Sequence, residues 1–129
     1  MQPFSPDTNS VFQLLSDKSV VQQFDGLLYE HTAVRFQLRL RISLVDQAVF
    51  FTNDYVSPVK RKYAFHWQNA GDSWLMRLDN APHFPTLATF PHHLHDYQST
   101  SETISDSDNI TLTKIQDYIS QHLNQPTVS

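Results

Sequence analysis

A strict alternation of apolar and polar residues between Val34 and Leu44 constrains the fold more than any other feature of the sequence. The apolar positions are Val34, Phe36, Leu38, Leu40, Ile42 and Leu44. Because successive side chains of a strand point to opposite faces, this period of two predicts a strand with one buried and one solvated face. We therefore expect the core to lie on an antiparallel sheet.

The next residues predict a hairpin partner for this strand. A two-residue turn at 46–47 would return the chain as a second strand. In that register Ile42 faces Phe51 in the core. On the other face Arg39 lies opposite Asp54, so opposite charges meet across the hairpin.

A second hairpin is predicted from residues 60–67 and 73–79, with its turn at 69–72. Its core face is aromatic, with Tyr63, Phe65 and Trp67 opposite Leu78, Met76 and Trp74. Because side chains alternate between faces, His66, Arg77 and Asp79 are expected together on the opposite face.

We predict helices at both ends of the sheet. Helical spacing of apolar residues appears over 9–15 and again over 111–123, where Thr111 can act as the cap. Residues 92–97 are expected to form a short strand, and the polar residues 98–109 a mobile loop. The prediction is a single α+β domain, 1–129, with residues 1–8 disordered and a core of about 9–124. Its antiparallel sheet would have about five to six strands, and both helices would pack on one face.

Composition excludes several functional classes. The chain has no cysteine, which rules out disulfides, thiolate metal sites and thiol nucleophiles. Only two glycines occur, and no glycine-rich phosphate-binding motif is present. A net charge of −4 argues against a broadly basic surface but leaves room for a local basic patch. No long apolar run or secretory signal is found, so we expect a cytoplasmic protein without a membrane partner.

Four histidines lie within thirteen residues in a proline-rich stretch, beside the expected positions of His66 and Arg77. Two imidazoles and a guanidinium can cleave RNA without a metal: one ring takes the 2′-hydroxyl proton, the other protonates the leaving oxygen, and arginine stabilises the phosphorane. The candidate catalytic residues are His66, Arg77, His83, His92, His93 and His95. The candidate binding residues are Asp79, Asn80, Arg35, Arg39, Arg41 and Lys62.

Two alternatives remain open for the same histidines. On a strand, His93 and His95 share a face, and Asp79 or His83 would complete a zinc or manganese sphere for a hydrolase. No tightly spaced ligand motif is met, so we assign neither a metal nor a cofactor from sequence. The other alternative is a non-catalytic protein-interaction module, in which the histidines bond to backbone carbonyls and the arginine row is a solvated face.

Three segments together resemble the TumE-type family of bacterial toxin–antitoxin proteins: Lys62–Gln68, Arg77–His83 and Phe90–His95. The resemblance covers residues 34–123. Phe84 and Leu94 stand where the family pattern has a second histidine and a lysine. The resemblance implies a toxin with a cognate antitoxin as its partner. RNA is our hypothesis for the target, and the oligomeric state stays open, with a homodimer among the options.

Overall fold

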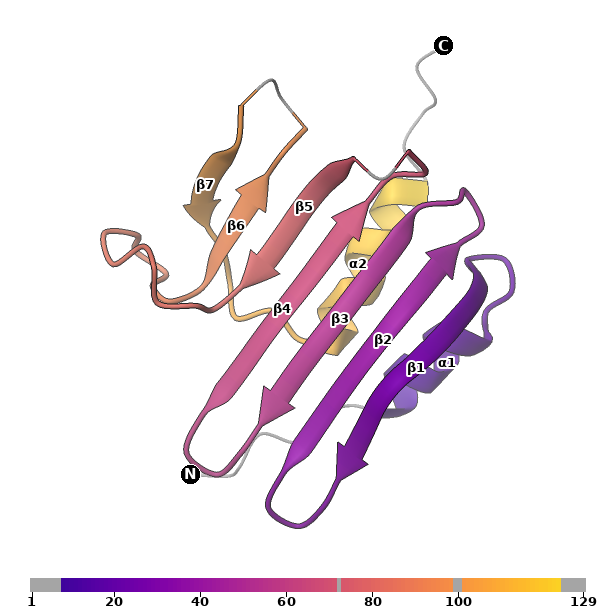
Figure 1. The fold of residues 1–129 in the computed structure, drawn as a ribbon, viewed down its shortest axis with the longest axis horizontal. Coiled ribbons are helices and arrows are strands. Elements are labelled where there is room, and N and C mark those ends of the chain that lie inside the picture. Colours follow the sequence, from indigo (N-terminus) through magenta and orange to yellow (C-terminus); the bar gives the residue numbers. More distant parts are fainter. Residues whose placement is uncertain (1–7, 72, 99–100, 124–129) are drawn as a thin grey trace.

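The computed structural model describes residues 8–71, 73–98 and 101–123, which form one seven-stranded antiparallel sheet with two short helices (Figure 1). Each strand pairs with the next along the chain, so the sheet is a simple meander. The elements are α1 (Thr8–Ser16), β1 (Val21–His31), β2 (Phe36–Leu44), β3 (Val49–Val56), β4 (Arg61–Gln68), β5 (Trp74–Asp79), β6 (His93–Asp96), β7 (Thr103–Asp106) and α2 (Leu112–Leu123).

The predicted α+β fold with about five to six strands is wrong, because the structure is mostly sheet. The described helices contain only 9 and 12 residues, whereas the seven strands contain between 4 and 11 residues each. One strand that was not predicted is β7, which lies in the segment 98–109 that was predicted to be a loop. Its four residues are mostly exposed and polar, so they carry no apolar alternation by which a strand is recognised.

The β2–β3 hairpin has a different register from the predicted one. Ile42 pairs with Phe50 and Arg39 with Asn53, so the predicted pairing of Arg39 with Asp54 is wrong. The backbone N–H of Leu44 donates to the Ala48 carbonyl, which leaves a loop of three residues, and Gln47 in that loop has a φ of 74°. A left-handed residue after a tight turn is typical of three-residue hairpin loops. The extra loop residue shifts the register by one.

The β4–β5 hairpin is also shifted, but by two residues. Phe65 pairs with Leu78 and Trp67 with Met76. Since side chains alternate with a period of two, this shift leaves the predicted faces unchanged. Trp74 is the exception: it was predicted in the core, but it is 50% exposed after an irregularity in the pairing near Gln68.

The core lies between one face of the sheet and the two helices, which are behind the strands in Figure 1. The sheet contributes alternating side chains such as Leu38, Leu40 and Phe65, and the helices contribute residues such as Leu15 and Ile119. Burial of these side chains is the main stabilising contribution to the fold. Neither described helix lies on the opposite face of the sheet, which we call the open face.

The ends of the chain fall largely outside the described residues. The predicted disorder of residues 1–8 concerns residues 1–7, which are not described, while Thr8 begins α1. α2 confirms the predicted C-terminal helix, and the Lys114 N–H donates to both the carbonyl and the hydroxyl oxygen of Thr111. Among the described helices, none has the length and apolar character needed to span a bilayer.

Candidate active site

Two rows of side chains cross the open face in register. One row runs across five strands as Arg41, Phe51, His66, Arg77 and His95. The neighbouring row consists of Arg39, Asn53, Ala64, Asp79 and His93. Antiparallel pairing places such opposite residues side by side on one face. The sheet therefore places three of the predicted histidines on the same face as Asp79 and three of the predicted arginines, which are Arg39, Arg41 and Arg77.

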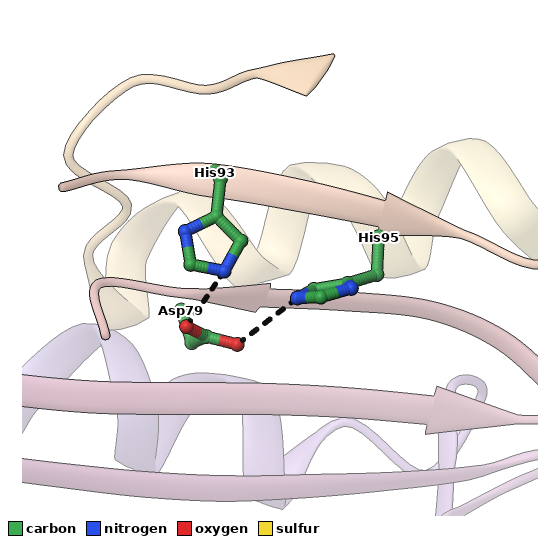
Figure 2. A group of neighbouring side chains, drawn as sticks. All are labelled: Asp79, His93 and His95. Atoms are coloured by element: carbon green, nitrogen blue, oxygen red, sulfur yellow. Dashed lines mark ion pairs between the residues drawn. The ribbon is translucent and has the colours of Figure 1, made fainter. Parts of the chain in front are cut away.

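The carboxylate of Asp79 is the centre of this site. It is almost fully buried, and its oxygens accept hydrogen bonds from the Arg77 Nε at 2.9 Å and the Ala81 backbone N–H at 3.0 Å. Its Oδ1 lies 2.9 Å from His93 Nε2, and its Oδ2 lies 3.6 Å from His95 Nε2. Figure 2 shows both rings reaching from β6 toward this carboxylate on β5.

Each of the two imidazoles has a second partner at its other nitrogen. His93 Nδ1 lies 2.9 Å from the carbonyl oxygen of Pro91, and His95 Nδ1 lies 2.6 Å from Glu102 Oε1. The hydrogen bond with His95 lowers the pKa of the Glu102 carboxyl below its ordinary value, which favours the carboxylate form. Both outer partners are thus hydrogen-bond acceptors, and the Nδ1 atom of each ring is the donor.

Aromatic rings enclose the imidazoles on the open face. Phe84, from the loop between β5 and β6, has its ring centroid 4.8 Å from His93 and 5.8 Å from His95. The His95 ring also stacks on the Tyr97 ring, with the ring centroids 6.1 Å apart and an angle of 6° between the ring planes. These contacts shield the site from bulk water, which strengthens the electrostatic interactions inside it.

His66 lies one strand away from this centre. Its ring packs edge-on against Trp74 with centroids 4.3 Å apart. Burial, and secondarily the nearby guanidinium of Arg77, lower the pKa of His66 below its ordinary value, against the opposing effect of a hydrogen bond with Gln68. His66 is therefore a neutral ring near pH 7.

His83 and His92 do not join the Asp79 cluster. His83 is exposed, and its ring centroid lies 6.4 Å from that of Phe84. His92 points to the other side of the sheet, where it stacks on Tyr63 and its Nδ1 lies 2.8 Å from the Tyr63 hydroxyl. Burial, followed by the charge of Arg61, lowers the pKa of His92.

The predicted binding residues divide into paired and unpaired groups. Arg35 forms an ion pair with Glu30, and Asn80 bonds through its side chain to the backbone of Arg61 and Tyr63, which ties the end of β5 to β4. Arg41 lies 3.8 Å from Asp25 and 5.9 Å from the centre of the Phe51 ring. Arg39 and Lys62 have no ion-pair partner in the part of the chain that the structure describes.

Sequence reasoning missed two contributors to the site, Glu102 and Phe84. Glu102 lies in the polar segment that was predicted to be a loop, and only the pairing of β6 with β7 brings it beside His95. Phe84 stood out only as a departure from the pattern around it, with no signal that it would cover the imidazoles. A buried carboxylate, two oriented imidazoles and a guanidinium can bind a cation or a phosphate, and can transfer protons.

Comparison with known proteins places the chain within one family. A family model described as "Toxin TumE" matches residues 11–124, which is most of the chain. Searches of the curated proteins and of the solved structures find no match.

Proposed function

This chain belongs to the TumE toxin family, and on that premise we propose that its toxic activity is the cleavage of RNA bound across the open face of the sheet. Membership of a toxin family also implies a cognate antitoxin as its partner. The observation that carries the proposal is the register of the open face, in which cations, aromatic rings and the imidazole site are aligned on neighbouring strands.

Cations on the open face support binding of a phosphate backbone. Arg39 and Lys62 are exposed, and Arg41 is half-buried beside Phe51. Arginine and lysine side chains supply most of the sequence-independent attraction between proteins and nucleic acids. Because the whole chain carries a net charge of −4, this patch is a local one, which favours binding along one defined track.

Aromatic side chains on the same face support recognition of a single strand. Phe51 and Tyr55 on β3 are half-buried and lie between the cations of β2 and β4, while Trp74 is 50% exposed near the imidazoles. Stacking of unpaired bases on aromatic rings of a sheet is a common mode of single-stranded RNA recognition. We therefore infer that the substrate is single-stranded.

RNA cleavage of this kind requires no external nucleophile. The 2′-oxygen attacks the phosphorus, the bond to the 5′-oxygen breaks, one proton leaves the 2′-hydroxyl and one reaches the 5′-oxygen. Arg77, whose side chain is 37% exposed, suits stabilisation of the phosphorane, and the half-buried His95 suits proton transfer. His93 is only 1% exposed, so it suits a role within the protein better than direct contact with RNA.

The test is cleavage of a labelled single-stranded RNA by the purified full chain. We expect shortened RNA. We also expect Lys62→Glu to weaken RNA binding and to reduce, by about 1, the slope of the logarithm of the binding constant against the logarithm of the salt concentration. Lys114→Glu is the matched control, since Lys114 is also an exposed lysine and lies on α2, on the other side of the sheet.

Two results would overturn the proposal. One is a chain that arrests growth when expressed while both cellular and labelled RNA stay intact. The other is an effect of Lys62→Glu on RNA binding no larger than that of Lys114→Glu. The first result would favour a toxin that acts by binding another macromolecule, and the second would remove the open face as the surface that binds RNA.

A further inference from the structure

We propose that Asp79, His93 and His95 bind one divalent first-row transition-metal ion, with zinc or manganese as the ions that suit these ligands. Imidazole nitrogens and a carboxylate oxygen are the donor set in which both ions are found in proteins. The inference goes beyond the proposed function, because binding of the ion does not depend on the identity of the substrate. With the ion bound, both nitrogens of His95 would be engaged, so the proton transfer proposed above for His95 applies to the chain without the ion.

The three ligand atoms already converge. Each of the three residues has a ligand atom within 4.8 Å of those of the other two, and Figure 2 shows both rings beside the carboxylate. Metal bonds of about 2.0–2.1 Å in tetrahedral geometry separate neighbouring ligand atoms by about 3.4 Å. The distance from Asp79 Oδ1 to His93 Nε2 is 2.9 Å and that from Asp79 Oδ2 to His95 Nε2 is 3.6 Å, so the two lie on either side of that value.

The hydrogen bonds at Nδ1 prepare both rings for a metal. A carbonyl oxygen can only accept, so the Nδ1 of His93 must donate to Pro91. The Nδ1 of His95 likewise donates to the carboxylate of Glu102. A neutral ring with its proton on Nδ1 presents a lone pair at Nε2. Histidine ligands of metal ions are commonly oriented in this way by a backbone carbonyl or a carboxylate.

The environment of His93 Nε2 is the observation that most favours a cation between His93 and Asp79. This atom is buried and makes no hydrogen bond within the described residues, although Asp79 Oδ1 is only 2.9 Å away. For a neutral His93 ring with its proton on Nδ1, two lone pairs would face each other at that distance and repel, and an unsatisfied buried polar atom is costly. A metal ion that is shared by nitrogen and oxygen, off the line between them, removes both problems.

Asp79 has the capacity for such an ion beside its existing partners. A carboxylate offers about four lone-pair positions, of which Arg77 and the Ala81 N–H occupy two. The backbone is fixed on adjacent strands, since Asp79 pairs directly with His93 and Arg77 with His95. The sheet itself therefore holds the ligands in place, so binding of the ion would cost little conformational entropy.

Three protein ligands leave at least one coordination position for a water molecule or a phosphate oxygen. On the open face this position would lie beside the exposed part of Arg77. When bound, the ion would act as a Lewis acid toward a phosphate oxygen. Arg77 would then stabilise the same phosphate, and Phe84 would keep bulk water from the ligands.

The experiment measures binding of zinc and manganese, by calorimetry, to the full chain after treatment with a chelator and removal of the chelator. We expect one ion per chain, and affinity for it reduced roughly 100-fold or more in His95→Gln. His83→Gln is the matched control, because His83 is exposed and outside the cluster. The affinity of this variant for the ion should equal that of the unaltered chain. Glu102→Gln changes only an exposed residue and should weaken binding by about tenfold.

Absence of stoichiometric binding of either ion overturns the inference, as does equal affinity in His95→Gln and His83→Gln. If circular dichroism shows that His95→Gln fails to fold, Glu102→Gln decides, and unchanged affinity in that variant counts against the site. The two proposals fail separately: zinc binding without RNA cleavage removes only the ribonuclease, and cleavage by a chain that binds no ion removes only the metal site.

Discussion

Two buried aspartates lie on opposite faces of the same sheet, and their partners differ in kind. Asp54 faces the core, where both of its oxygens accept hydrogen bonds from Arg61 at 3.0 Å. Asp79 lies on the open-face side, where a guanidinium reaches only one oxygen and two imidazole nitrogens point at the carboxylate. The first carboxylate has its charge neutralised within the protein, and the second is arranged for a further cation.

The surroundings of the two carboxylates reinforce this difference. The guanidinium of Arg61 lies 4.2 Å from the centre of the Tyr63 ring, and burial of Asp54 raises its pKa against the opposing effect of Arg61. Around Asp79 the Nδ1 atoms of both imidazoles donate to other acceptors, and their Nε2 atoms face the carboxylate. We therefore interpret Asp54 as structural, because its neighbour neutralises its charge and satisfies its hydrogen bonds, and Asp79 as functional, because its neighbours do not.

The largest expected effect breaks the Asp54 pair. Arg61→Ala leaves a buried carboxylate without its cation, which should lower the free energy of unfolding by about 3–5 kcal/mol. Urea denaturation followed by circular dichroism measures this loss. Arg35→Ala, which breaks the exposed pair with Glu30, should leave stability unchanged. A similar small effect for both variants would refute the contrast between a buried and an exposed pair.

The next effect is stabilisation by zinc, which should depend on Asp79 and not on Asp54. At a zinc concentration of about 100 times Kd, binding to the folded state adds about 2.7 kcal/mol to the free energy of unfolding. We expect Asp79→Asn to abolish most of this gain. Asp54→Asn should show the full gain relative to the same variant without zinc, even if its stability without zinc is lower. Thermal melts with and without zinc measure both. A zinc response that disappears in Asp54→Asn alone would reverse our assignment of the two sites.

The smallest effect concerns the hydroxyl of Tyr63 on the Asp54 side. Tyr63→Phe removes the contact with His92 Nδ1 at 2.8 Å, and should cost about 0.5–1.5 kcal/mol of stability. Zinc affinity should not change, because His92 points away from the Asp79 cluster. Chemical denaturation and zinc calorimetry on the same preparation check both statements. Weakened zinc binding would mean that the two faces are coupled through β6.

Side-chain parity explains which parts of the site could be predicted from the sequence. The grouping of His66, Arg77 and Asp79 holds because the β4–β5 register differs from the expected one by two residues, which preserves the faces. The β2–β3 register differs by one because of the three-residue loop, and that shift moves Asp54 from the predicted open-face position to the core. An odd shift changes the chemistry of a residue, and an even shift does not.

Contacts between distant segments explain what could not be predicted. Asp54 forms its ion pair with Arg61 on the neighbouring strand, whereas the expected register paired the Asp54 carboxylate with Arg39. Glu102 orients His95 only because a short, polar β7 pairs with β6. Nothing in the spacing of His93 and His95 specified which ring nitrogen would face Asp79, since that depends on the backbone carbonyl of Pro91 and on Glu102.

The most direct test of the metal site is anomalous X-ray diffraction from crystals of the full chain grown with zinc, with data collected on both sides of the zinc absorption edge. We predict one strong anomalous peak within bonding distance of the Asp79 carboxylate and of the Nε2 atoms of His93 and His95. No peak there, with His93 Nε2 instead donating a straight hydrogen bond to Asp79, would contradict the account and identify the pair as an internal imidazolium–carboxylate salt bridge.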